Sequence, residues 1–177
     1  MARKQSIDPL IAQAEHILSQ VYLPRIESCL QLLSAEQIWW RPNAASNSVG
    51  NLVLHLAGNV RQWIVSGLGG ATDLRQRDRE FAEQGPVPRR GLAARLRRTV
   101  NEACGVMRKL TAEDLARVHA IQKFRVTGRE AVFHVAEHFS HHAGQIILLT
   151  KMLRGTDLRF TRLPGEKTRK GRKLPAW

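Results

Sequence analysis

Hydrophobic residues recur every three or four positions along most of the chain, and no segment shows a convincing alternation of apolar and polar residues. This period is typical of amphipathic helices, and the sequence contains no internal repeat. We therefore predict an all-α protein with four substantial helices, at about 8–33, 47–67, 91–109 and 127–154. Four helices of this length favour a four-helix bundle, whose core commonly hosts metal sites built from facing helices.

Local residue signals set the expected helix boundaries. Pro24 is expected to kink or restart the first helix, and Gly155 to stop the last one. Two pairs have the capping-box pattern that opens a helix, namely Ser34 with Gln37 and Thr127 with Glu130, and Ser46 or Asn47 can cap the second helix. Between the helices we expect a charged connection over 71–88 and, over 111–125, a linker with at most one short turn.

The last predicted helix carries four histidines within nine positions: His134, His138, His141 and His142. At about 100° per residue, His138 and His142 lie about 40° apart, the relation that lets two imidazoles hold one divalent ion from a single helix. The helical wheel places this pair in the middle of an apolar stripe formed by Ala131, Val135, Ile146, Leu149, Met152 and Leu153, with His134 and His141 at its edge. Burying imidazoles among hydrocarbon costs about 1–3 kcal/mol per unpaired polar group. A shared metal removes that cost; the alternative is a pair of core histidines with satisfied hydrogen bonds.

The second predicted helix has Arg61 as its only charged residue between positions 48 and 66, so we expect it to be buried on most sides. Beside its apolar stripe runs a neutral polar strip made of Ser48, Asn51, His55, Asn59, Gln62 and Ser66. Such a strip on a buried helix is typical of the wall of a wet pocket. His55 is therefore either a further metal ligand or a hydrogen-bonded packing histidine.

Composition narrows the class of protein. The chain has 177 residues, 43% of them hydrophobic, which suits one globular domain, with a net charge of +13. No secretory signal or bilayer-length apolar stretch is recognisable, and Cys29 and Cys104 match no paired-cysteine spacing, so a cytoplasmic protein with reduced thiols is expected.

A basic tail is expected to follow the bundle, which we assign to residues 1–160. Residues 161–177 contain six lysines and arginines against one glutamate. This composition predicts a mobile arm that solubilises the protein or touches phosphates. Only Phe160 and Trp177 could stack on bases there, so nucleic-acid binding is the least favoured role.

The ordered motifs of the chain resemble the DinB/YfiT-like superfamily of metal-binding four-helix bundles, in particular a bacterial branch of unknown function. The matching segments are WWRPN at 39–43, NSVGNLVLHLAGNVRQW at 47–63, RDREF at 77–81 and EHFSHHAGQI at 137–146, within a likeness that spans roughly 23–160. The resemblance implies that His55, His138 and His142 hold a divalent metal ion, zinc or nickel. Trp39, Trp40 and the almost wholly apolar second helix suggest more hydrophobic surface than one thin bundle hides. We therefore expect a homodimer, as is frequent in similar bundles, with the first helix or the tryptophan motif at the interface.

Three protein nitrogens leave a coordination position open, as in catalytic rather than structural sites. The superfamily includes enzymes that use low-molecular-weight thiols, so the resemblance implies a thiol-dependent S-transferase acting on small electrophiles. The alternatives are a metal-dependent hydrolase and a non-catalytic metal-binding stress protein with a nucleic-acid-binding tail. The candidate catalytic residues are Asn59, Gln62 and Gln145, which could position a substrate, and His141, which could carry a proton.

Overall fold

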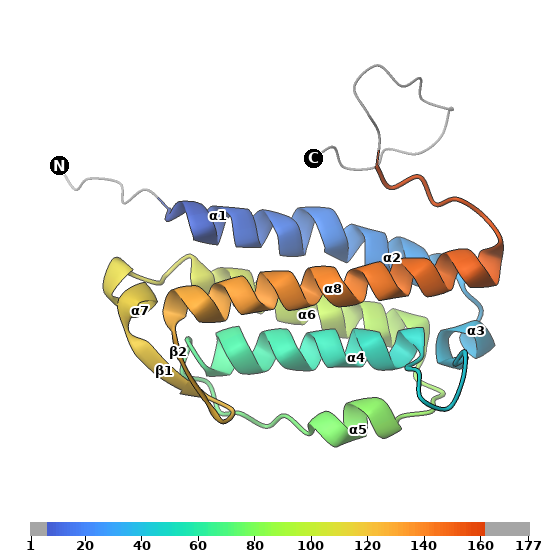
Figure 1. Cartoon of the computed structure of the whole chain (residues 1–177), viewed down its shortest axis with the longest axis horizontal. Helices are drawn as coiled ribbons and strands as arrows, with labels where there is room; N and C mark the ends of the chain where they lie inside the picture. The colour runs from blue at the N-terminus through green and yellow to red at the C-terminus, as the bar shows by residue number, and fades with distance from the viewer. Residues whose placement is uncertain (1–6, 162–177) are drawn as a thin grey trace, which may run out of the picture.

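Four helical rods pack side by side in the computed structural model, which describes residues 7–161 (Figure 1). The first rod joins α1 (Pro9–Glu15), the π-helix η1 (His16–Tyr22) and α2 (Leu23–Leu32). The second joins α4 (Val49–Val60) and the π-helix η2 (Arg61–Ser66), and the others are α6 (Arg89–Met107) and α8 (Gly128–Arg154). Three short helices connect them, namely α3 (Ala35–Trp39), α5 (Arg77–Ala82) and α7 (Ala112–Ala116). The predicted four-helix bundle is confirmed.

The helix boundaries follow the predicted capping signals. Both predicted capping boxes form, at the start of α3 and of α8, and Gly155 ends α8 in the left-handed conformation at φ 59°. Pro24 lies in the first turn of α2, directly after the π-helix η1, so the helix type changes at the position where a kink or restart was predicted. The second rod begins at Val49, two residues later than expected, because Ser48 rather than Ser46 or Asn47 caps α4 through a third capping box.

The core lies between the four rods, and every residue of α4 is buried, as predicted from its composition. Ile26, Leu56, Val100 and Phe139, one from each rod, are all 0% exposed. Within residues 7–161, no helix is both long and apolar enough to span a membrane.

The prediction of a linker over 111–125 is wrong. This stretch contains α7, the strand β1 (Val118–Ile121) and the first two residues of the strand β2 (Phe124–Thr127). The two strands pair as an antiparallel hairpin. Each strand has only four residues, too few for a visible alternation, and the turn uses Gln122 at φ 56° instead of a glycine. The charged connection at 71–88 likewise contains α5, and the predicted basic tail lies, from residue 162 on, outside the described residues.

Candidate metal centre

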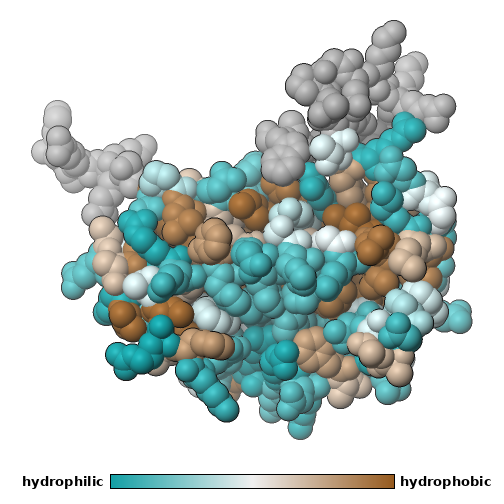
Figure 2. Space-filling model, in the orientation of Figure 1, coloured by the Kyte–Doolittle hydropathy of each residue, from teal (hydrophilic) through white to brown (hydrophobic). Residues whose placement is uncertain are grey.

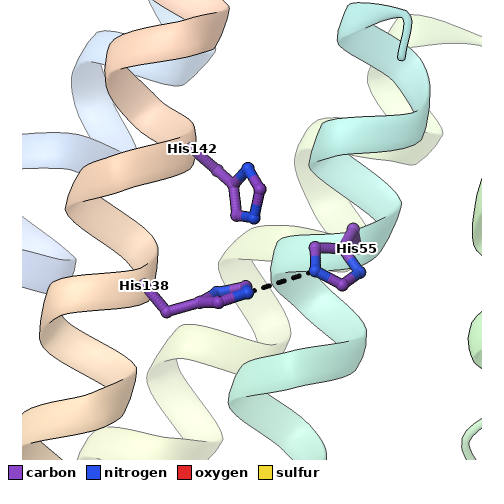
Figure 3. Close-up of side chains that lie close together, drawn as sticks. All are labelled: His55, His138 and His142. Carbon is purple, nitrogen blue, oxygen red and sulfur yellow. Dashed lines mark hydrogen bonds between the residues drawn. The ribbon is translucent and has the colours of Figure 1, made fainter. Parts of the chain in front are cut away.

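Three histidines from two rods converge in the middle of the bundle. His55 projects from α4, and His138 and His142 project from α8, so that one ring nitrogen of each lies within 4.8 Å of the other two (Figure 3). His55 Nε2 and His138 Nε2 are 3.1 Å apart. Two nitrogens bound to one ion at about 2.0–2.1 Å have this separation when the angle between the bonds is about 100°. The geometry therefore fits a shared divalent ion.

The histidine pair of α8 lies at the border of the buried face rather than in its middle, which corrects the helical-wheel prediction. α8 contacts both the first rod and α4. The residues of α8 that are fully buried include Val132, Val135, Phe139, Ala143 and Ile146. His138 and His142 are half-buried and face α4, whereas Met152, predicted in the stripe, is 59% exposed. Figure 2 shows the consequence, a hydrophilic band over the stretch where α8 and α4 lie side by side in Figure 1.

Burial keeps the α8 pair uncharged. Loss of solvent, and then the neighbouring His142 and His55 rings, lower the pKa of His138 to about 3. Burial also lowers the pKa of His142, although its hydrogen bond with Gln145 opposes this. Both imidazoles are therefore neutral at neutral pH, the state in which a ring nitrogen offers its lone pair to a metal.

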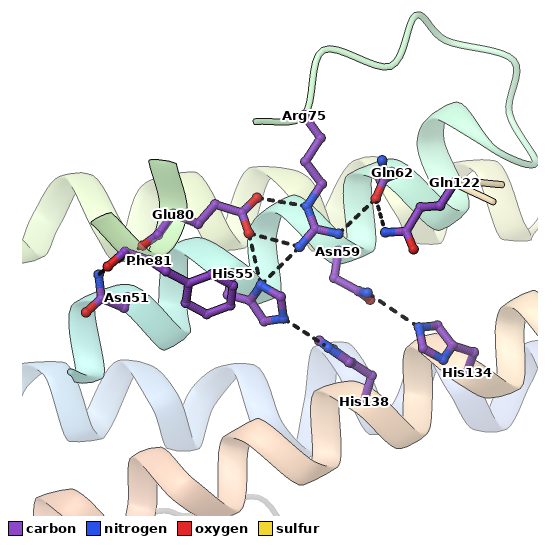
Figure 4. Close-up of polar contacts among 10 residues, drawn as sticks. All are labelled: Asn51, His55, Asn59, Gln62, Arg75, Glu80, Phe81, Gln122, His134 and His138. Carbon is purple, nitrogen blue, oxygen red and sulfur yellow. Dashed lines mark hydrogen bonds and ion pairs between the residues drawn. The ribbon is translucent and has the colours of Figure 1, made fainter. Parts of the chain in front are cut away.

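His55 is held from behind by a buried ion pair (Figure 4). Its Nδ1 lies 2.9 Å from Glu80 Oε2, while Arg75 Nε and Nη2 donate to the two Glu80 oxygens at 2.8 and 2.9 Å. Burial alone would raise the pKa of Glu80, but hydrogen bonds from Arg75 and His55 outweigh it and lower that pKa. A carboxylate only accepts hydrogen bonds, so His55 carries its proton on Nδ1 and turns the Nε2 lone pair toward the other two rings. In this tautomer the 3.0 Å approach of Arg75 Nη2 to Nδ1 is a contact, not a hydrogen bond.

The sequence did not single out Arg75 and Glu80 as site residues. The only signal for Glu80 was its place in the RDREF motif, because a carboxylate in a charged stretch is usually solvated. Two features of α4 bring it to His55. Asn51 donates from Nδ2 to the backbone oxygens of Glu80 and Glu83, at 2.9 and 2.8 Å, and so fastens α5 to α4. Gly58 leaves room for the carboxylate, since a Cβ there would lie 1.9 Å from Glu80 Oε1.

Two of the four predicted catalytic residues lie next to His142 on α8. Gln145 Oε1 accepts a hydrogen bond from His142 Nδ1 at 2.7 Å, which leaves His142 Nε2 with its lone pair. Gln145 Nε2 lies 3.2 Å from Nε2 of His141. His141 itself is exposed and is not one of the three clustered ligands, but its ring lies edge-on to that of His142, with centroids 5.0 Å apart.

The other two predicted catalytic residues lie beside the triad rather than in it. Gln62 Oε1 accepts from Arg75 Nη1 at 2.9 Å and so supports the ion pair behind His55. Asn59 Nδ2 lies 3.4 Å from Nε2 of His134, whose ring contacts that of Trp63 with centroids 4.0 Å apart and planes tilted by 35°. The structure thus places Asn59 next to His134, which is not a member of the triad. The His134 ring in turn contacts the His138 ring, with centroids 5.5 Å apart.

The fold and the cluster define a class of protein: four-helix bundles with a histidine triad between the second and the last helix. The chain belongs to the family described as Protein of unknown function (DUF1572), which matches residues 11–167. A search of curated proteins finds no match.

Solved structures described as DinB-like proteins and as YfiT share the fold. The DinB-like protein YjoA of Bacillus subtilis is 20% identical, with a TM-score of 0.62 over 85% of this chain and 96% of that one. A DinB-like protein of Bacillus cereus is 17% identical, with a TM-score of 0.59 over 75% and 86%. YfiT of Bacillus subtilis, described as a probable metal-dependent hydrolase with an unusual four-helix bundle topology, is 17% identical, with a TM-score of 0.65 over 87% and 94%.

Proposed function

We propose that the protein is a divalent-metal-dependent enzyme in which His55, His138 and His142 hold the ion, zinc or nickel. The observation that carries this proposal is the convergence of three ring nitrogens within 4.8 Å, two of them 3.1 Å apart. The description of YfiT as a probable metal-dependent hydrolase supports it. All three ligands are nitrogens of the type zinc and nickel accept, and a three-ligand set leaves a position for substrate.

Each residue around the triad has a defined task in this proposal. Glu80 fixes the tautomer of His55, and Arg75 keeps Glu80 ionised and oriented. Gln145 does for His142 what Glu80 does for His55, through a neutral amide oxygen. A divalent ion held there would supply Lewis acidity, which lowers the pKa of a nucleophile and polarises the group it attacks.

Two nucleophiles fit this site. A thiol would make the protein an S-transferase for small electrophiles, the activity that the resemblance of the sequence implies. Water would make it a hydrolase, the activity favoured by the likeness to YfiT. In both cases Gln145, next to His142 and open to solvent, is the residue that can orient the second reactant.

Metal content tests the ligand set directly. Protein purified without a chelating tag should contain about one divalent ion per chain by elemental analysis, and His138→Ala or His142→Ala should abolish binding, because two nitrogens hold a metal poorly. His134→Ala is the matched control, since it removes a histidine of the same helix outside the triad. Equal metal loss in the control, or a fully loaded His142→Ala variant, would contradict the ligand set.

Turnover separates the two reactions. Metal-loaded protein is assayed with several cellular thiols and model electrophiles, and in parallel with activated esters, each beside His142→Ala. S-transfer requires that thiols perturb the absorption of a cobalt-substituted site and that conjugation fails in the variant. Ester cleavage without any thiol effect would assign the hydrolase. If the metal is bound and neither reaction is detected, the ion would have a structural role.

A further inference from the structure

A pocket lies behind the ion pair that holds His55. It has a volume of ≈360 Å³ and is lined by residues of α4, η2, α5, α6 and the segments on both sides of α5. Arg75 and Glu80 belong to its wall, whereas none of the three triad histidines does. Figure 4 shows these two side chains between His55 and the loop that carries Arg75. The Arg75–Glu80 ion pair therefore lies between the pocket and the triad.

The carboxylates of this pocket are already engaged within the chain. Both oxygens of Glu80 bond to Arg75, and Oε2 also bonds to His55. Asp73 accepts from the side chain of Gln62 and from its neighbouring backbone N–H at position 75. Glu83 Oε1 accepts from two backbone N–H groups just after α5, at 3.0 and 2.8 Å.

Two of the four arginines that line the pocket form ion pairs. Arg75 pairs with Glu80, and Arg61 pairs with Glu102 at 2.7 Å. Within residues 7–161, the guanidinium groups of Arg79, on α5, and Arg95, on α6, have no hydrogen-bond or ion-pair partner. Thr99, one turn after Arg95 on α6, is 7% exposed and lines the pocket.

We propose that this pocket binds a small molecule carrying a phosphate or carboxylate group, with Arg79 and Arg95 as its charge partners and the Thr99 hydroxyl as a further donor. Guanidinium groups from two helices can approach one anion from two sides, and bonds to charged groups are the strong ones. Leu54, Ala57 and Gly58 give the pocket a neutral part of its lining, which can accommodate a compact uncharged body. A volume of ≈360 Å³ suits a small molecule rather than a polymer.

Calorimetric titration of the full-length, metal-free chain tests the proposal, with inorganic phosphate in one arm and succinate in the other, at constant ionic strength. The variants are Arg79→Ala and Arg95→Ala. The matched controls are Arg90→Ala and Arg98→Ala, which remove the same charge from exposed positions of α6 outside the pocket. We expect at least one anion to bind, each pocket variant to weaken it about tenfold or more, and the controls to change it little. The tighter of the two anions identifies the ligand group.

Three results would overturn the proposal. Equal weakening in the controls would mean general attraction to a chain of charge +13. In a parallel titration of zinc-loaded protein, anion binding that appears only with the metal and is lost in His142→Ala would place the anion on the triad. In a separate titration, binding of duplex DNA by a chain that binds neither small anion at millimolar concentration would assign the basic surface to a polymer. Because the main titration uses metal-free protein, its outcome does not depend on the proposed enzymatic function.

Discussion

Gly58→Ala tests whether Glu80 supports the metal centre. The added Cβ would lie 1.9 Å from Glu80 Oε1 and 2.9 Å from Arg75 Nε, so the carboxylate must retreat until the contact reaches about 3.5 Å. That movement breaks the 2.8 Å bond from Arg75 and displaces the oxygen that orients His55. A lost bond to a charged group costs about 1.5–3 kcal/mol. Replacing a helical glycine by alanine returns about 1 kcal/mol. The net loss of stability is about 0.5–2 kcal/mol.

Gly105→Ala is the matched control, because Gly105 lies in α6 and a Cβ there would meet nothing within 4 Å. Denaturant unfolding should show Gly105→Ala stabilised by up to about 1 kcal/mol and Gly58→Ala destabilised. Titration with zinc should show about 10–100-fold weaker binding in Gly58→Ala alone, the usual loss when a residue supporting a ligand is displaced. If Gly58→Ala were as stable as the control and bound metal normally, Glu80 would have no supporting role.

Three further predictions concern Glu80, His138 and the assembly of the chain. Glu80→Gln should weaken metal binding about 10–100-fold, because an amide has one acceptor oxygen and cannot accept from both Arg75 Nε and His55 Nδ1 as the carboxylate does. Glu83→Gln, which lies outside the triad contacts, should leave metal affinity unchanged, and equal effects of the two variants would contradict this. The low pKa of His138 means that the folded metal-free chain binds fewer protons than the unfolded chain, so stability should fall as pH drops from about 6.5 toward 3. His138→Gln should flatten that slope in acid denaturation, and an unchanged slope would refute the assignment. Sedimentation at tens of micromolar, a working range for such affinities, should show a homodimer, and a monomer would count against it.

The fold could be predicted largely because its signals are local. Capping residues such as Ser34 and Thr127, a terminal glycine and a helical apolar period act within a few residues of the boundary they set. The hairpin at 118–127 has no such signal, since its pairing joins two short strands through a turn without glycine. It forms where the chain must bridge the end of α7 and the start of α8, and Gly128 fits there against the backbone of Asp114.

The triad was predictable for another reason: two of its members are four residues apart on one helix, and His55 lies in a neutral strip on a buried helix. The supporting ion pair was not, because it depends on where a loop folds back. Arg75 and Glu80 are 20 and 25 positions from His55, and no helical period links them to it. Gly58 is a local sign of this contact, because a glycine in a helix interior is unusual. The structure explains it, since a Cβ there would collide with Glu80.

The charges around the triad bear on which reactants it favours. The ligand cluster contains three histidines and no carboxylate, and the pKa values of His138 and His142 are lowered, so these rings contribute no charge at neutral pH. Behind His55, the charges of Glu80 and Arg75 cancel. A divalent ion held there would therefore keep most of its positive charge, unlike one bound by aspartate or glutamate. Such a charge in a partly buried site favours a reactant that becomes anionic, and a thiol or a water molecule both meet that condition. The same balance disfavours a substrate that brings a further cation to the triad.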